Sequence, residues 1–218
     1  MRFCRSARPS GRPSPRPFLR LIAALVLPLA LAACVEGSGT GGAPAAVALG
    51  GGAVTIAGPA GFCVDSRESR DGAKGGFVLM GSCASVSGQP SAVRPPEAAI
   101  LTASVAGPAG ADFAARLPAI AQYLQTGPGH AALSRRGSAK SVTINSLSQA
   151  DGVLYLRATD TAPARGQSVT PAYDRAILAV KGRIVTLSVL ALTSHPLSPD
   201  ASRSILDAFV ARVQGANR

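Results

Sequence analysis

Aromatic side chains and catalytic motifs are scarce in this chain of 218 residues, which has no tryptophan, three tyrosines and two histidines. Proteins that hold single-stranded nucleic acid combine basic grooves with aromatic rings, and no such combination occurs here. The chain also lacks a G-x-S-x-G elbow, an S-x-x-K motif, an H-E-x-x-H motif and a Walker A lysine. These absences exclude the hydrolases and nucleotide-binding proteins that carry those motifs. We expect no nucleic-acid partner, no cofactor and no bound metal.

No apolar run is long enough to remain in a membrane as a helix. The longest, Leu21 to Leu31, has eleven residues, whereas a spanning helix needs about 20. Residues 1–20 before it contain six arginines and no acid, and the small residues Ala32 and Ala33 follow it. This arrangement is typical of a secretory signal, so residues 1–33 are predicted to be a signal peptide.

The end of the signal, Leu31-Ala32-Ala33-Cys34, resembles the lipobox of bacterial lipoproteins. The resemblance implies that Cys34 is acylated and becomes the first residue of a protein anchored at the periplasmic face of a Gram-negative membrane. The alternative is plain cleavage at Ala30-Leu31-Ala32, which leaves a free Cys34 thiol on a soluble periplasmic or secreted protein. The position directly after the apolar run favours lipidation.

Acidic residues are half as frequent as basic ones, 11 against 22. Six of the basic residues lie in the predicted signal, so the remaining chain has a net charge of +5. An excess of this size predicts mild attraction to anionic surfaces and does not indicate a nucleic-acid-binding protein.

Only four cysteines occur, and two of them are accounted for by export. Cys4 lies in the signal and Cys34 is the predicted lipid site, which leaves Cys63 and Cys83. Disulfides persist in the periplasm, and a bridge closing about 20 residues stabilises a fold by roughly 3 kcal/mol. A zinc or redox pair would need C-x-x-C spacing and, for zinc, further ligands nearby. The sequence therefore predicts a structural disulfide between Cys63 and Cys83.

Glycine-rich sequence separates the predicted signal from one domain. Residues 35–53 are small and Gly-rich, so we expect residues 34–53 to form a lipidated flexible tether. Gly37, Gly39 and Gly42 match the dinucleotide fingerprint, but that motif requires a preceding strand and a following helix. Residues 54–218 are long enough for a single domain with its own core.

The domain is predicted to be α+β, with a largely antiparallel sheet and two helices. Asp151-Gly152 and Lys181-Gly182 each indicate a tight hairpin, and residues 183–192 are apolar on both faces, as a central strand would be. Ser198-Pro199 predicts the start of a closing helix. The other expected strands are 54–57, 62–64, 76–80, 99–105, 141–148, 153–158 and 176–180, and a central helix is expected over 112–124, with a late start or a kink at Pro118.

The order of these elements is similar to the PsbP-like fold of many small exported lipoproteins. Four segments also resemble a family of uncharacterised alphaproteobacterial exported proteins, and the resemblance covers most of residues 54–215. That resemblance implies no activity. The segments are Gly61-Phe62-Cys63-Val64-Asp65, Gly81-Ser82-Cys83, Leu133-Ser134-Arg135-Arg136-Gly137 and Gly182-Arg183-Ile184-Val185-Thr186-Leu187-Ser188-Val189.

Two groups of residues are weak candidates for chemistry. His130 in a predicted turn and His195 in a predicted loop qualify as general bases, because imidazole is the usual side chain for that role, but neither has a partner motif. Asp65, Glu68 and Asp71 recur at every third residue, as in a calcium loop. Because basic residues are interleaved with them, we interpret this segment as a solvated, self-neutralising loop.

The one concentrated basic cluster outside the signal consists of Arg135, Arg136 and Lys140. Guanidinium groups bind carboxylate and phosphate well, although short basic clusters also occur as ordinary solvated surface.

The first functional hypothesis is a lipid-anchored binding or accessory module that holds an envelope protein or an anionic ligand through this patch or its sheet. The second is an unrecognised periplasmic hydrolase or transferase with a loop histidine as base.

Overall fold

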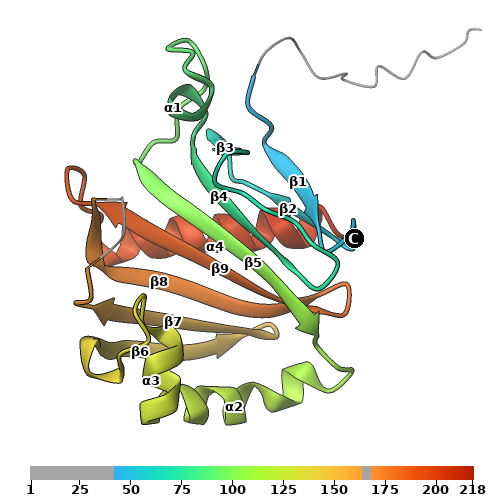
Figure 1. The fold of residues 1–218 in the computed structure, drawn as a ribbon, viewed down its shortest axis with the longest axis vertical. Coiled ribbons are helices and arrows are strands. Elements are labelled where there is room, and N and C mark those ends of the chain that lie inside the picture. The colour runs from blue at the N-terminus through green and yellow to red at the C-terminus, as the bar shows by residue number, and fades with distance from the viewer. Residues whose placement is uncertain (1–41, 164–167) are drawn as a thin grey trace, which may run out of the picture. The chain divides into compact units, whose positions relative to one another are not determined.

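The computed structural model describes residues 42–163 and 168–218, and all of these belong to one compact unit. Nine strands occur in them (Figure 1). The strands are β1 (Ala46–Leu49), β2 (Val54–Ala57), β3 (Phe62–Val64), β4 (Gly76–Ser82), β5 (Ala99–Pro108), β6 (Val142–Ala150), β7 (Val153–Asp160), β8 (Val169–Val180) and β9 (Arg183–Leu192). The helices are α1 (Cys83–Ser87), α2 (Phe113–Leu124), α3 (Gly127–Leu133), the 3-10 turn η1 (Ala139–Ser141) and α4 (Pro199–Gly215).

Seven strands form one antiparallel sheet in the order β3-β4-β5-β9-β8-β7-β6, and β1 and β2 form a separate two-stranded sheet. The predicted α+β class is therefore confirmed. The strand β9 lies in the middle of the seven, as expected for a strand that is apolar on both faces.

Both predicted hairpins are present, and their turns explain why. Asp151 and Gly152 between β6 and β7 have φ of 51° and 74°, and Lys181 and Gly182 between β8 and β9 have 46° and 70°. Two consecutive residues in the left-handed region are the signature of a type I′ turn, whose twist matches that of the flanking strands. The turns thus set the register of each pair.

The first face of the sheet is covered by α4, which lies behind the sheet in Figure 1 and packs against β8, β9 and β2. The Ser198 hydroxyl accepts a hydrogen bond from the Ala201 N–H at 3.1 Å and caps the helix, with Pro199 at its first position. Leu206 and Phe209 of α4 are completely buried in the main core.

The second face is covered over only part of its width. The helices α2 and α3 pack near β6, β7 and β8 (Figure 1). Phe113 and Leu117 of α2 join Leu154 and Leu156 of β7 in a second buried cluster. The predicted central helix is confirmed, and Pro118 lies inside it at an exposed position.

Three details differ from the expectations. The segment expected to be tether contributes β1, because the buried Leu49 anchors residues 46–49 beside β2. The segments 54–57 and 62–64, read as one interrupted strand, belong to different sheets. The turn expected around His130 is the short helix α3, capped by the Thr126 hydroxyl, which accepts from the Gly129 N–H at 3.2 Å.

The edge strand β6 contains an irregularity in its pairing with β7. Ile144 lies opposite Ala158 and Ser146 lies opposite Arg157, so Asn145 is an extra residue in the ladder. Such a bulge bends the strand and increases its local twist.

Candidate functional site

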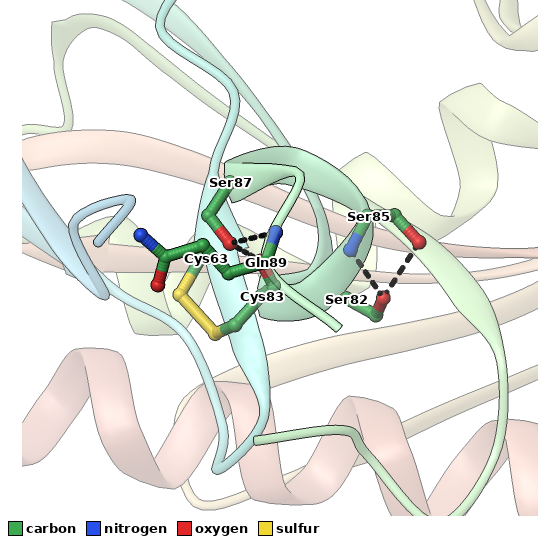
Figure 2. Close-up of a disulfide and its surroundings, with 6 residues drawn as sticks. All are labelled: Cys63, Ser82, Cys83, Ser85, Ser87 and Gln89. Carbon is green, nitrogen blue, oxygen red and sulfur yellow. Dashed lines mark hydrogen bonds between the residues drawn. A yellow bond between two sulfur atoms is a disulfide. The ribbon is translucent and has the colours of Figure 1, made fainter. Parts of the chain in front are cut away.

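The predicted disulfide is confirmed and joins β3 to the start of α1 (Figure 2). The Cα atoms of Cys63 and Cys83 are 4.7 Å apart. Figure 2 shows the serines that form hydrogen bonds at the two ends of this short helix. The Ser82 hydroxyl caps its start by accepting from the Ser85 N–H at 3.2 Å, and the Ser87 hydroxyl donates to the Cys83 carbonyl at 2.6 Å. The disulfide therefore fixes α1 to the edge of the main sheet.

Two acidic residues of the disulfide loop, Asp65 and Asp71, accept hydrogen bonds from backbone N–H groups. The Asp71 carboxylate accepts hydrogen bonds from the N–H groups of Gly50 (2.6 Å) and Gly51 (3.3 Å), so it holds the β1–β2 turn. The hydrogen bond from Gly50 is the main reason that the pKa of Asp71 lies below its usual value. Asp65 accepts from the Arg67 N–H at 3.0 Å. Among the described residues, no three His, Cys, Asp or Glu side chains are grouped to hold a metal ion.

The three basic residues singled out in the sequence have different surroundings. The half-buried Arg135 guanidinium donates to the Thr170 carbonyl at 2.9 Å and thereby links α3 to β8. The exposed Arg136 donates to the Pro163 carbonyl at 3.2 Å, and Lys140 lies exposed in η1. Arg135 is therefore partly buried, whereas Arg136 and Lys140 lie exposed at the surface.

The anchor of this region is the buried carboxylate of Asp160 at the end of β7. It accepts from the Arg135 N–H at 2.6 Å and from the Ala162 N–H at 3.0 Å. Burial by itself would raise the pKa of Asp160. The hydrogen bonds from Ser141 and from these two N–H groups lower the pKa by more than burial raises it, so the net shift is downward. The ionised carboxylate therefore ties the α3–β6 connection to the end of β7.

A cationic centre that the sequence did not reveal lies next to this region, on the second face of β8. The Tyr173 hydroxyl donates to the Leu133 carbonyl at 3.1 Å. The ring of Tyr173 contacts two guanidinium groups, with its centroid 5.0 Å from Arg175 Cζ and 5.9 Å from Arg135 Cζ. Arg175 also donates through Nε to the hydroxyl of Ser188 at 3.0 Å. We call Arg135, Tyr173 and Arg175 the guanidinium cluster.

Among the residues that the structure describes, Arg175 has no acidic partner. No carboxylate lies within 4.0 Å of its guanidinium in the described part of the chain, where the ion pairs are Arg157–Asp174 and Arg203–Asp207. Burial lowers the pKa of Arg175; the interaction with Tyr173 opposes this shift and the charge of Arg135 adds to it. Fully buried charges almost always have a partner of opposite sign. Arg175 is partly withdrawn from water and lacks such a partner among the described residues, so the guanidinium cluster favours an added carboxylate or phosphate.

The cluster borders a part of the second face that no described helix covers (Figure 1). Along β4, β5 and β9, the side chains that point to this uncovered part alternate with the side chains that are buried under α4. The side chains of the uncovered part are partly exposed to solvent. The strand register aligns Leu79, Thr102, Ser188 and Arg175 in one row across the sheet. We call the partly exposed set the open face: Phe77, Leu79, Ile100, Thr102, Ser104 and Thr186.

The structure does not bring the two histidines into one site. His130 is half-buried in α3. His195 lies after β9, where its Nδ1 is 3.0 Å from the Ser194 hydroxyl, at a cavity of about 400 Å³ that Arg94 and Glu97 also line. Among the described residues, no carboxylate is hydrogen-bonded to either imidazole.

Arg175 and Tyr173 were not predicted as site residues because the strand was expected to start only at Ala176. A longer strand would have placed Tyr173, Arg175 and Ile177 on one face, and an arginine between apolar neighbours on an inner strand is the signal that was available.

No protein-family model matches the chain, and comparison with curated proteins and with solved structures finds no match either. The resemblance to the PsbP-like fold and to the alphaproteobacterial exported family therefore stays a prediction. Among the described helices, none has the length and apolarity needed to cross a membrane. Cys34 and the signal lie outside the described residues.

Proposed function

We propose that this protein is a lipid-anchored binding or accessory module of the bacterial envelope, held to the membrane through Cys34 and binding a protein partner through the open face. The observation that carries the proposal is the Arg175 guanidinium, which is partly buried beside the open face without an acidic partner among the described residues.

The chemistry of the surface defines the partner. The open face offers apolar side chains, such as Phe77 and Leu79, next to hydroxyls. The guanidinium of Arg175 lies at its border, and that of Arg70 lies over the Phe77 ring. An apolar centre with an arginine is the composition of protein-binding surfaces. The expected partner presents a carboxylate side chain flanked by apolar residues, because only an anion would neutralise Arg175.

In-cell cross-linking and pull-down of tagged protein tests the proposal. We expect wild type to capture a discrete partner and Arg175→Gln to lose it, since the substitution removes the charge that the partner's carboxylate would bind. Arg116→Gln, at an exposed position of α2, is the matched control and should retain the partner. Equal capture by both variants would overturn the use of the open face.

The anchor is tested separately with Cys34→Ala and a radiolabelled fatty acid. We expect label and membrane association in wild type and neither in the variant, because the thiol is the acylation site. Unlabelled wild type in the soluble fraction would contradict the anchor without bearing on the open face.

A second function, hydrolysis or group transfer, is favoured by the Ser194–His195 pair at its cavity. A general base needs its nucleophile within hydrogen-bond reach, and the 3.0 Å contact meets that condition. Turnover of ester substrates that is abolished by both His195→Ala and Ser194→Ala, with the fold intact, would establish it in place of the binding module.

A further inference from the structure

A mostly apolar hollow of about 490 Å³ lies beside the disulfide, away from the open face. Its lining includes Pro59, Phe62 and Val93 together with Cys83, and its charged lining residue is Arg212 of α4. Ligand cavities of several hundred Å³ typically combine an apolar lining with a few polar groups that orient the ligand. The hollow has this composition.

Close backbone packing fixes the wall of the hollow. Gly61 has φ of +84°, and a Cβ at this position would lie 2.4 Å from the Pro95 nitrogen. A Cβ on Gly58 would lie 2.5 Å from Cε of Met80. The Cys83 N–H donates to the Gly61 carbonyl at 2.8 Å, so the wall is tied to the disulfide. The hollow is therefore a built feature of the fold.

Arg212 supplies a cation at the rim. Its Nε donates to the Gly58 carbonyl at 3.4 Å, and no carboxylate in the described part of the chain lies within 4.0 Å of the guanidinium. Its remaining N–H groups are available to an incoming anion, and a guanidinium binds a carboxylate through two parallel hydrogen bonds.

Val93 supplies exposed apolar surface at the same place. It is 68% exposed and is the most exposed large hydrophobic residue described. Single exposed aliphatic side chains are common on protein surfaces, but Val93 also lines the hollow and so extends its apolar lining to the solvent side.

We infer that this hollow binds a single-chain anionic amphiphile, a fatty acid, with the alkyl chain against Pro59, Phe62 and Val93 and the carboxylate on Arg212. Charge complementarity selects an anionic head group, and the apolar lining selects an alkyl body over a sugar or a polar peptide. The inference does not depend on the open face, because it uses other residues.

Backbone amide NMR of the purified Cys34→Ala protein, titrated with sodium dodecanoate below its micellar concentration, tests the inference. We expect saturable shifts at Ala60, Val93 and Arg212. Dodecyltrimethylammonium, with the same chain and the opposite charge, should bind at least tenfold more weakly, because Arg212 repels it.

Arg212→Gln should weaken dodecanoate binding about tenfold, since a charged hydrogen bond is lost. The matched control Arg116→Gln should bind as the parent does, and Val93→Ser should also weaken binding. Both altered residues are exposed, so the fold is retained and the amide spectrum reports it. Absence of saturable shifts, shifts located elsewhere, or equal binding of the cationic amphiphile would overturn the inference.

Discussion

The two faces of the main sheet are covered to different extents. On the first face, α4 and the β1–β2 hairpin bury a continuous cluster that includes Leu187 and Phe209. On the second face, α2 and α3 cover the β6–β8 end, and the open face over β4, β5 and β9 stays partly exposed. The same strands therefore contribute to a closed core on one side and to accessible surface on the other.

The contrast teaches where stability and binding are located. The closed face contains apolar contacts whose removal leaves cavities, whereas the open face contains hydroxyls, apolar side chains and the border cation Arg175. The guanidinium cluster lies where helix coverage ends, so its charge is partly desolvated and still reachable.

The largest expected effect is on the closed face. Phe209→Ala should lower the free energy of unfolding by about 3–5 kcal/mol, because a completely buried ring is replaced by a cavity. Urea unfolding followed by circular dichroism measures the change. Tyr123→Ala on α2, where the residue is half exposed, is the control and should change stability by less than about 1 kcal/mol. Similar losses in both would contradict a closed core under α4.

The disulfide at the β3 edge should have the next largest effect. Replacing Cys63 and Cys83 together by alanine should lower the free energy of unfolding by roughly 3 kcal/mol, because the 20-residue loop becomes free in the unfolded chain. Urea unfolding with and without dithiothreitol measures the effect. The reductant should lower wild type to the level of the double variant and leave the variant unchanged.

Two neighbouring residues of β4 allow the contribution of each face to stability to be compared within one strand. Val78 of β4 is completely buried on the closed face, and Leu79 is partly exposed on the open face. Val78→Ala should lower the free energy of unfolding by about 2 kcal/mol and Leu79→Ala by less than about 1 kcal/mol, although the second substitution removes more atoms. The reverse order in urea unfolding would show that the open face is covered.

The smallest effect is confined to acid pH. The pKa of Asp160 is lower in the folded protein than the value of about 3.9 for an unfolded chain. The stabilisation by this carboxylate is therefore present above that value and is lost as pH falls through the folded pKa. Urea midpoints at pH 7 and pH 3 should differ less in Asp160→Asn than in wild type. Asp112→Asn, where the carboxylate makes no capping hydrogen bond, should behave as wild type.

Local rules of sequence predicted the elements that depend on neighbouring residues. The two hairpins follow from Asp151-Gly152 and Lys181-Gly182, and α4 follows from its cap and its apolar stripe. The disulfide followed from cysteine number and export context.

Features that depend on distant contacts were not predictable in the same way. The strand β1 lies in small-residue sequence and exists because Leu49 packs under another sheet. Arg175 becomes a candidate binding group only because Tyr173 and Ser188 contact it and no acid among the described residues pairs with it. The sequence contains the arginine but does not indicate the missing partner.

The extra residue Asn145 in β6 has a consequence for crowding. An edge strand with regular spacing can accept another chain's strand, and copies of one protein meet more often as its concentration rises. The bulge interrupts the regular row of N–H and C=O groups on β6, and the exposed side chains of that strand are mainly Ser, Thr, Asn and Gln. The edge therefore resists strand addition between copies.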